Sequence, residues 1–545
     1  MYLIVRNYDK LIAYVQLCTI SCLFIGVLTF FIAFNKLYLY FNQVIKFVMK
    51  FIVRILVVLL FPFLVSGQKK PNLTTFDAYV QKAVNDWQVP GLAIIVIKDN
   101  QVLFKKGYGV LELGKPEKVD TQTLFACAST TKAMTAACAA MLVDEGKLHW
   151  EDKVTDYLPD LQLYDPFVTR ELTVKDLFLH DSGVGNTDFL WGSMNISSDE
   201  VLHRMRMVKP EYSFRGGFIY QNIFYLAAGK VIEKASGMPW ETFIQKRIFD
   251  PLKMTRTVPL VKYSLEKANV SSAHFEIDKK VQVIDKQTTD AIAPAGSVWS
   301  CVDDMGKWVI CMLDSGKYEG GRLLTPESWA MLLKPQTMVT MEMYPTIRVI
   351  KPHWSTYGMG WFQWDYKGQK IDFHTGSING LVALNGMMVD KKTGVYILAN
   401  LDHAEVRHAL MYKAFDFFTL GGDTDWSAVF LKLYGDIKAK AEKEQQEADA
   451  KRVIGTHPSL DIKEYAGTYT DPLYGSVVIT TQNDSLRVIM NNVLSVTARH
   501  WNYDTFKGYY DKKEIGQGTV SFTLDEYGKI SAVNIDGAVF ARKAN

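Results

Sequence analysis

The sequence predicts an α/β domain in which strands from both ends of the domain form one sheet around a helical insertion, followed by a small antiparallel β-domain. Three observations predict this order. Strand-like runs begin near residue 91 and return after residue 379, and the segment from about 158 to 280 has helical periodicity. Short alternating runs follow residue 457, and 545 residues exceed what one compact core usually holds.

Composition and charge exclude several classes of protein. Hydrophobic residues make up 48% and charged residues 22%, which is ordinary for a globular chain and argues against disorder or a fibre. The net charge of +3 gives no indication of a nucleic-acid partner. Six cysteines form no CxxC pair and no zinc-like cluster with histidine, so we expect neither a metal nor a cofactor. The sequence does not decide whether Cys301 and Cys311 form a disulfide bridge, whereas Cys127 and Cys138 are interpreted as buried thiols.

The N-terminal residues 1–67 form a hydrophobic leader that allows two interpretations. Residues 11–34 are apolar over a length that can span a bilayer. Residues 49–67 combine Lys50 and Arg54, a short apolar run and small residues at the end, a pattern typical of a signal peptide. On that second interpretation the first 48 residues precede the natural start. Both interpretations predict an exported protein, whether periplasmic, secreted or membrane-anchored.

A catalytic domain is expected over residues 68–425, and its first elements follow from local patterns. An amphipathic helix is predicted near 76–87, and the apolar runs at 91–98 and 102–108 are predicted strands joined by an Asp-Asn turn. A long apolar helix is expected to open at Ser129 and to end at Gly146, a residue typical of helix C-termini.

The second half of the chain returns to strands. Residues 383–389 and 395–399 are predicted to complete the sheet, after the helical insertion. Residues 426–457 form a linker dense in Lys, Glu, Ala and Gln, which predicts an exposed helix. Residues 458–545 are expected to form the small β-domain. Its predicted strands are 476–481, 485–490, 519–524 and 530–535.

Ser129 and Lys132 form a Ser-x-x-Lys motif at the start of the predicted helix. Positions i and i+3 share one face of a helix, so the lysine amine can reach the serine hydroxyl. A serine needs a base to become a nucleophile, and a lysine can be that base where burial lowers its pKa. The motif alone is weak, because Ser-x-x-Lys also arises by chance in many helices.

Two further motifs follow in order along the chain. Tyr220 and Asn222 lie at i and i+2, so in an extended segment both side chains can face one pocket. His374, Gly376 and Ser377 belong to a His-Thr-Gly-Ser run after a strand-like segment, where small residues let a substrate backbone approach and N–H groups can hold an oxyanion. Each motif alone is as consistent with packing as with function, but three in a fixed order are much harder to produce by chance.

The ordered set resembles the serine β-lactamase-related hydrolases, the group that includes class C β-lactamases, D-Ala-D-Ala carboxypeptidases, D-aminopeptidases and related esterases. The resemblance covers about residues 75–420 and includes other segments. These are PGLA at 90–93, LFLHDSG at 177–183, PLKM at 251–254, PAG at 294–296 and YGMGW at 357–361. It implies a β-lactamase/transpeptidase-like fold, an antiparallel sheet flanked by helices with a helical subdomain. The end of the chain is similar to a small barrel-like domain that in some relatives covers the active-site entrance or mediates assembly.

The resemblance also implies roles for the motif residues. Ser129 would be acylated, Lys132 and Tyr220 would transfer protons, and Asn222 would orient the substrate. The backbone amides of Ser129 and Ser377 would form the oxyanion hole. No cofactor or metal is implied, and the partner would be a small-molecule or peptide substrate. A homo-oligomer and membrane attachment through the N-terminus are both compatible with the sequence.

One position departs from the family pattern, because His374 stands where a lysine is usual in the K-T-G form of the motif. Histidine is largely neutral near pH 7, so it offers a substrate carboxylate no permanent charge. This favours esters, amides or peptides over efficient β-lactam hydrolysis. The alternatives are a weak β-lactamase and a non-catalytic penicillin-binding-like sensor.

Two other groupings are set aside. The segment from His403 through Glu405 to His408 has the wrong spacing for a zinc helix. His180-Asp181-Ser182 resembles a compressed catalytic triad, but adjacent residues do not easily align for one, so we interpret it as a structural turn.

Overall fold

A computed structural model describes residues 2–64 and 72–543 of the protein. The first of two compact units contains one helix, α1 (Tyr2–Leu64), in which Leu23–Ile52 is long and apolar enough to cross a membrane. This stretch overlaps the expected span at 11–34. The helix also contains most of the expected signal peptide at 49–67, whose cleavage-like site at 65–67 lies outside the described residues.

The second unit begins at Asn72 and is built on an antiparallel sheet of eight strands in the order β2-β1-β14-β13-β12-β11-β10-β9. The strands are β1 (Gly91–Lys98), β2 (Gln101–Gly109), β9 (Thr337–Met338), β10 (Ser355–Gly358), β11 (Trp361–Tyr366), β12 (Gln369–Ile378), β13 (Leu381–Met388) and β14 (Thr393–Ala399). Because β1 pairs with β14, Leu92 opposite Ala399, the sheet joins the two ends of the domain as predicted.

Both faces of this sheet are covered by helices, which explains why β1 is apolar at nearly every position. Alternate residues of β1 point to opposite faces. Ala93, Ile95 and Ile97 belong to the core that includes α3 and α8, whereas Leu92, Ile94 and Val96 belong to the core that includes α2 and α15. The bounds of these and the neighbouring helices are α2 (Leu73–Asp86), α3 (Thr131–Asp144), α8 (Asn222–Ser236), α12 (Val302–Leu313), α13 (Pro326–Leu332) and α15 (Val406–Phe415).

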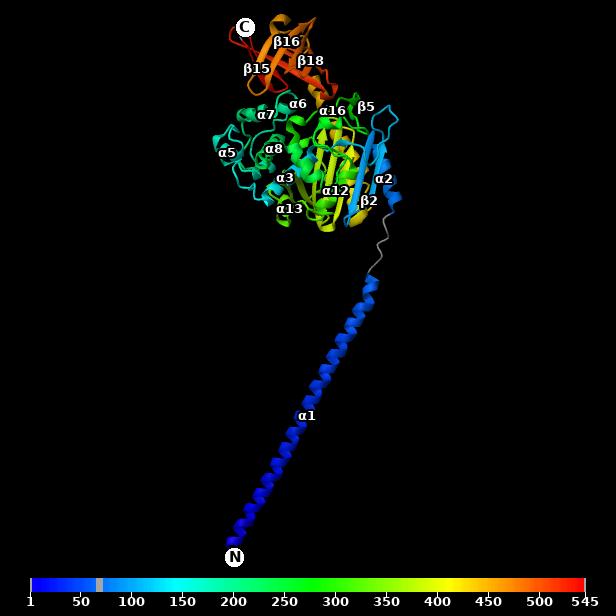
Figure 1. Ribbon diagram of the computed structural model, residues 1–545, viewed down its shortest axis with the longest axis vertical. Helices are drawn as coiled ribbons and strands as arrows, with labels where there is room; N and C mark the ends of the chain where they lie inside the picture. Colours follow the sequence, from blue (N-terminus) through cyan, green and yellow to red (C-terminus); the bar gives the residue numbers. More distant parts are fainter. Residues whose placement is uncertain (1, 65–71, 544–545) are drawn as a thin grey trace. The chain divides into compact units, whose positions relative to one another are not determined.

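A helical subdomain lies beside the sheet, with α5, α7 and α8 grouped together in Figure 1. Its helices are α4 (Val154–Tyr157), α5 (Pro166–Glu171), α6 (Phe189–Gly192), α7 (Ser198–Arg204), α8, α9 (Trp240–Ile244) and α10 (Val261–Ser264). Short elements fill the connections: β3 (Phe125–Ala126) with β6 (Trp299–Ser300), β4 (Ala273–Ile277) with β5 (Lys280–Ile284), β7 (Lys317–Tyr318) with β8 (Gly321–Arg322), α11 (Ala293–Gly296) and α14 (Ile347–Ile350). The fold is therefore the β-lactamase/transpeptidase-like arrangement that the sequence predicts.

The long helix α16 (Trp426–Ala450) leads to a closed barrel of eight antiparallel strands. The strands are β15 (Gly467–Asp471), β16 (Gly475–Gln482), β17 (Ser485–Met490), β18 (Leu494–Asn502), β19 (Thr505–Tyr510), β20 (Gln517–Leu524), β21 (Ile530–Ile535) and β22 (Ala538–Arg542). The barrel closes where β15 pairs with β22, Tyr469 opposite Arg542. Alternate residues such as Val477 and Ile479 fill the interior, so the expected all-β domain is confirmed as a closed barrel.

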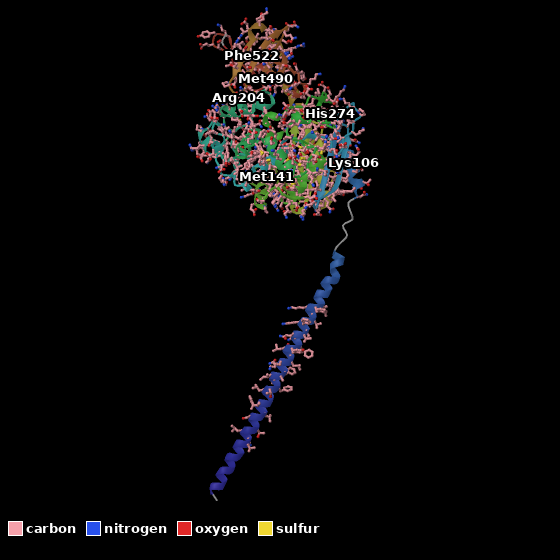
Figure 2. All side chains as sticks on the ribbon, viewed as in Figure 1. Lys106, Met141, Arg204, His274, Met490 and Phe522 are labelled. Atoms are coloured by element: carbon pink, nitrogen blue, oxygen red, sulfur yellow. The ribbon has the colours of Figure 1, made fainter. Side chains whose placement is uncertain are left out.

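The barrel contacts the helical subdomain through the turn between β15 and β16. The guanidinium of Arg204 on α7 donates a hydrogen bond of 2.8 Å to the carbonyl oxygen of Leu473. The ring of Phe189 on α6 lies 4.6 Å from the ring of Tyr474, centroid to centroid. These contacts place the barrel next to α6, which also borders the site described below. Figure 2 labels Arg204 on the helical subdomain and Met490 on the barrel.

Candidate active site

Ser129 lies in a short turn of 3-10 helix (Ala128–Thr130) immediately before α3. The long helix thus begins two residues later than the sequence predicts. The reason is the backbone of Ala128, which has a φ of 45° and so adopts a conformation that L-residues rarely take. Such strain persists only where the surroundings enforce it, and it is common at functional sites. The turn leaves Ser129 partly exposed while Ala128 and Thr130 are buried.

Lys132 is fully buried behind Ser129, one helical turn along. Its Nζ lies 3.0 Å from the Oγ of Ser129, 2.6 Å from the Oδ1 of Asn222 and 2.9 Å from the carbonyl oxygen of Ala295. Burial lowers the pKa of Lys132 to about 7, while the more distant carboxylate of Asp188 acts in the opposite direction. Near pH 7 a large fraction of the amine is therefore neutral and able to accept a proton.

Tyr220 completes the surroundings of this amine, whose Nζ lies 4.9 Å from the centre of the tyrosine ring. The hydroxyl of Tyr220 is buried and has no hydrogen-bond partner among the described residues. Burial raises the pKa of Tyr220 well above 10, and the nearby Ser129 hydroxyl offsets part of this rise without meeting the geometry of a hydrogen bond. The hydroxyl therefore keeps its proton, and its bonding capacity is free for another group.

Asn222 is the first residue of α8 and connects Lys132 with Asp188. Its Oδ1 accepts from Lys132, so its Nδ2 must face the other way, where it donates to Asp188 Oδ1 and Oδ2 at 2.9 and 3.0 Å. The three side chains form a continuous hydrogen-bonded row. Asp188 fixes the amide orientation in which an oxygen, not a nitrogen, faces the lysine.

His374 is buried on β12, and both of its ring nitrogens are engaged. Nδ1 lies 2.6 Å from the carbonyl oxygen of Thr375 and must donate to it, so Nε2, 3.0 Å from the hydroxyl of Tyr357, accepts. Burial, assisted by the charge of Lys132, lowers the pKa of His374 to about 3. The ring is neutral at physiological pH.

The end of β12 lies close to the turn that contains Ser129. Beyond Phe373 the strand is no longer paired with β11, and it pairs only with β13, Gly376 opposite Ala383. A Cβ atom at Gly376 would lie 2.2 Å from the carbonyl oxygen of Cys127 and 3.1 Å from the amide nitrogen of Ser129. Only glycine allows this approach.

Arg407 holds the same strand from behind. Its guanidinium donates to the carbonyl oxygen of Gly376 at 2.6 Å and to the Oγ of Ser377 at 2.9 Å. Glu405 accepts from that guanidinium at 2.9 Å and from the Nδ1 of His408 at 2.8 Å. All three charged or titratable side chains are buried, so the strand end is fixed by a network with little access to water.

Replacing Gly376 by alanine is expected to lower kcat/KM by about 10²-fold or more, the usual effect of losing an oxyanion-hole donor. The new methyl group would push β12 away from Ser129, because the carbonyl oxygen it meets is backbone and cannot rotate aside. Ester hydrolysis by the purified variant measures the effect. Gly435→Ala is the matched control, since a methyl group there meets nothing within 4 Å; equal losses in both variants would contradict the prediction.

A cavity of about 1030 Å³ opens over Ser129. The motif residues Tyr220, Asn222, His374 and Ser377 line it together with Ser129. The remaining walls come from α6 and the following loop, the segments around 285–288 and 343–344, the strand end at 378–379, and the barrel residues Asn492, Val493, Leu494, Lys512, Glu514 and Ile515. The barrel thus forms part of the wall of this cavity.

The structure brings all seven sequence-predicted site residues to this one place: Ser129, Lys132, Tyr220, Asn222, His374, Gly376 and Ser377. Sequence reasoning missed Asp188 and Arg407. Asp188 belongs to none of the sequence motifs. Arg407 lies inside the segment from His403 to His408, whose spacing does not fit a zinc helix. The charged residues of this segment are the only sequence signal for its role.

The groupings set aside have structural roles. The Nδ1 of His180 accepts from the backbone N–H of Gln221, which fixes the segment containing Tyr220, and burial lowers the pKa of His180 well below its ordinary value. Glu405 is engaged by Arg407 and His408. Within the described ranges no three His, Cys, Asp or Glu side chains are grouped to hold a metal ion. Cys301 and Cys311 are both free and buried, so the bridge left open is not formed.

The fold and the site together define a protein of the β-lactamase and transpeptidase fold class, the architecture of serine hydrolases. A family model described as Beta-lactamase matches residues 76–415, which is most of the chain, and the chain belongs to this family. A second model, described as a domain of unknown function (DUF3471), matches residues 451–544 and so covers the barrel.

Individual relatives agree with this assignment. Unguisins hydrolase ungD of Aspergillus violaceofuscus is 28% identical over 434 residues, covering 74% of this chain and 75% of its own length. Protein flp of Staphylococcus aureus is 22% identical over 334 residues, 60% of this chain and 62% of its own. The octameric penicillin-binding protein homologue from Pyrococcus abyssi superposes with a TM-score of 0.55 at 19% identity, over 86% of this chain and 100% of its own. That last likeness shows the fold.

Proposed function

We propose that the protein is a serine hydrolase that cleaves ester or amide bonds through an acyl-enzyme on Ser129. The observation that supports this most directly is the pair formed by Ser129 and Lys132. The amine lies 3.0 Å from the hydroxyl, is fully buried and has a pKa lowered to about 7. A neutral amine in hydrogen-bond contact with a partly exposed serine is what activation of that serine requires.

In the proposed reaction, neutral Lys132 takes the proton of the Ser129 hydroxyl as its oxygen attacks the substrate carbonyl. The resulting oxyanion is stabilised by the backbone N–H groups of Ser129 and Ser377. Tyr220, whose hydroxyl has no hydrogen-bond partner among the described residues, donates its proton to the leaving group and is reprotonated by the proton that Lys132 took, and Asn222 orients the substrate. Water then attacks the acyl-enzyme, and the same groups return the proton to Ser129.

The substrate class follows from His374. A neutral ring at this position contributes no charge for a substrate carboxylate, and the two nitrogens are already engaged within the protein. Esters, amides or peptides without a required carboxylate fit this site better than β-lactams do. The relative named unguisins hydrolase supports hydrolysis as the type of reaction.

We also propose that the protein works outside the cytoplasm or at a membrane, attached through α1, whose apolar stretch Leu23–Ile52 supports an anchor.

The Pyrococcus abyssi homologue is octameric, which supports testing this chain as a homo-oligomer. Sedimentation of the purified protein measures that state.

Intact-mass spectrometry of the full chain in lipid nanodiscs tests the proposed chemistry. The protein is treated separately with a fluorophosphonate and with benzylpenicillin. We expect one phosphonate adduct in the wild type and in Ser182→Ala, no adduct in Ser129→Ala, and no lasting penicillin adduct. Ser182→Ala is the matched control because it removes the serine of the His-Asp-Ser turn.

The other outcomes separate the alternatives. A stable penicillin adduct on Ser129 would move the function toward a penicillin-recognising enzyme or sensor. An adduct retained in Ser129→Ala would contradict the assigned nucleophile. No adduct with either reagent, in a protein shown to be folded, would favour a non-catalytic binding protein.

A further inference from the structure

A second cavity of about 530 Å³ lies where the barrel meets α6. Its barrel wall is the open end of the barrel's hydrophobic core, because Leu494, Tyr510, Ile535 and Phe540 belong to that core. Met490, Tyr474 and Ala538 pack against the same core and also line the cavity. An eight-stranded barrel is just wide enough either to be filled by its own side chains or to hold one small ligand.

This second cavity adjoins the cavity over Ser129. Five residues line both: Phe189, Ser193, Met194, Leu494 and Ile515. Phe189 comes from α6 and Met194 from the loop after it, whereas Leu494 and Ile515 come from the barrel. A long ligand attached at Ser129 therefore has these shared residues in its path, with the mouth of the barrel behind them.

The lining of the second cavity favours an apolar ligand. Three of its polar side chains are engaged within the barrel. The hydroxyl of Tyr510 donates to Asp536 at 2.7 Å, and Asp536 also accepts from the N–H of Thr519 at 2.8 Å. The amide of Asn491 donates to the carbonyl oxygen of Tyr474 and accepts from the N–H of Ser476. Apart from Ser193, the rest of the lining is mostly methionine, leucine, isoleucine and aromatic surface, including Met194, Met490 and Phe540.

The walls of the cavity are held in place independently of any ligand. Gly475 lies so close to Met194 that a Cβ atom there would be 2.9 Å from the Met194 Cε. The hydrogen bond from Arg204 to Leu473 and the contact between the tilted rings of Phe189 and Tyr474 also join the helical subdomain to the barrel. A binding cavity formed in advance loses little free energy to ordering when a ligand enters.

We propose that the mouth of the barrel binds the aliphatic chain of a medium- or long-chain acyl substrate while its carbonyl is transferred to Ser129. This inference rests on the proposed function and names the substrate class for the same site. The chain leaves water along Phe189, Met194 and Leu494 and ends among the apolar side chains of the barrel. The size of the cavity at the barrel mouth then determines which acyl-chain lengths the enzyme prefers.

The test fills the cavity and leaves the catalytic residues untouched. Ala538 lines the cavity, and its neighbour Val539 on β22 faces solvent with 52% of its surface exposed. Ala538→Trp therefore blocks the barrel mouth, and Val539→Trp is the matched control with the same side chain on the outer face. Full-length proteins in lipid nanodiscs are assayed with 4-nitrophenyl acetate and 4-nitrophenyl octanoate, so that partition into lipid is common to all of them.

Each methylene that leaves water is worth about four-fold in kcat/KM, so a blocked cavity should be visible in the ratio of the two substrates. We expect the wild type and Val539→Trp to prefer octanoate over acetate, and Ala538→Trp to lose about ten-fold or more of that preference while acetate hydrolysis is unchanged. An unchanged ratio in Ala538→Trp, or an equal loss on both esters, would overturn the inference.

Labelling with ethyl and octyl fluorophosphonates separates this inference from the proposed function. Labelling of Ser129 by both reagents at equal rates, in wild type and Ala538→Trp alike, would overturn the role of the barrel and leave the serine chemistry standing. Failure of both reagents to label Ser129 would overturn the proposed function itself. Faster labelling by the octyl reagent, lost in Ala538→Trp, supports the inference.

Discussion

Replacement of Lys132 by methionine is expected to lower kcat/KM for ester hydrolysis by about 10³-fold, within the range of general-base contributions. Methionine has nearly the length of lysine and fits the buried site, but it cannot take the proton of Ser129, which lies 3.0 Å from the lysine amine. Steady-state hydrolysis of 4-nitrophenyl acetate measures the loss. Lys105→Met is the control, because this lysine is half-exposed on β2 and pairs with Asp303, away from the cavity.

The pH dependence of the wild-type enzyme belongs to the same prediction. In the proposed mechanism the neutral form of Lys132 is the active one, and its pKa is about 7, so log kcat/KM should rise with unit slope below pH 7 and level off above it. His374 cannot produce this curve, because its pKa is about 3 and its ring is neutral throughout. A profile that is flat from pH 5 to 8 would contradict the role of Lys132.

Replacement of Arg407 by methionine is expected to lower the free energy of unfolding by about 3–5 kcal/mol, the usual result of removing one partner of a buried ion pair. The change leaves the Glu405 carboxylate buried with only His408 beside it. Arg170→Met, which removes an exposed pair with Glu171, should cost less than about 1 kcal/mol. Urea unfolding followed by tryptophan fluorescence compares the two variants.

The loss in Arg407→Met should also depend on pH. Burial alone would raise the pKa of Glu405, but Arg407 and His408 reverse this and hold it well below its ordinary value. The wild type therefore keeps this stabilisation above the ordinary carboxyl pKa and loses it only in strong acid. Without Arg407, burial raises the pKa of Glu405. Protonation of Glu405 at lower pH then removes the buried unpaired charge and makes the variant less unstable. The gap between wild type and variant should be wider at pH 8 than at pH 5; a gap that widens toward pH 5 would contradict this account.

The sequence predicts strands β1, β2, β13 and β14 of the sheet but not β10 and β11, although these are also buried. Strand β1 is apolar throughout because both of its faces are covered, and the runs at 383–389 and 395–399 correspond to β13 and β14 for the same reason. In the barrel, strands β16, β17, β20 and β21 were predicted from alternating residues. Strands β15, β18, β19 and β22 were missed, since short polar stretches such as that of β15 owe their pairing to barrel closure, which is a long-range contact.

The site divides in the same way. The motif residues could be found because acyl-transfer chemistry requires particular side chains at fixed spacings, as with Ser129 and Lys132. Asp188 and Arg407 act through other residues, on Asn222 and on the backbone of Gly376, and many side chains could serve such roles. No spacing marks them, and only the folded chain brings them to the site. The strained φ of Ala128 is equally invisible in a sequence, because alanine gives no signal for it.

The pairing of β15 with β22 has a consequence for biosynthesis. Residues 538–542 are the last strand to leave the ribosome, and until they do, β15 keeps an unpaired edge that can join other chains. The catalytic domain can fold earlier, since domains generally fold as units from the N-terminus. A nascent or truncated chain would therefore have Ser129 and Lys132 in place before the barrel closes. The exposed edge of β15 would distinguish such an incomplete chain from the finished protein.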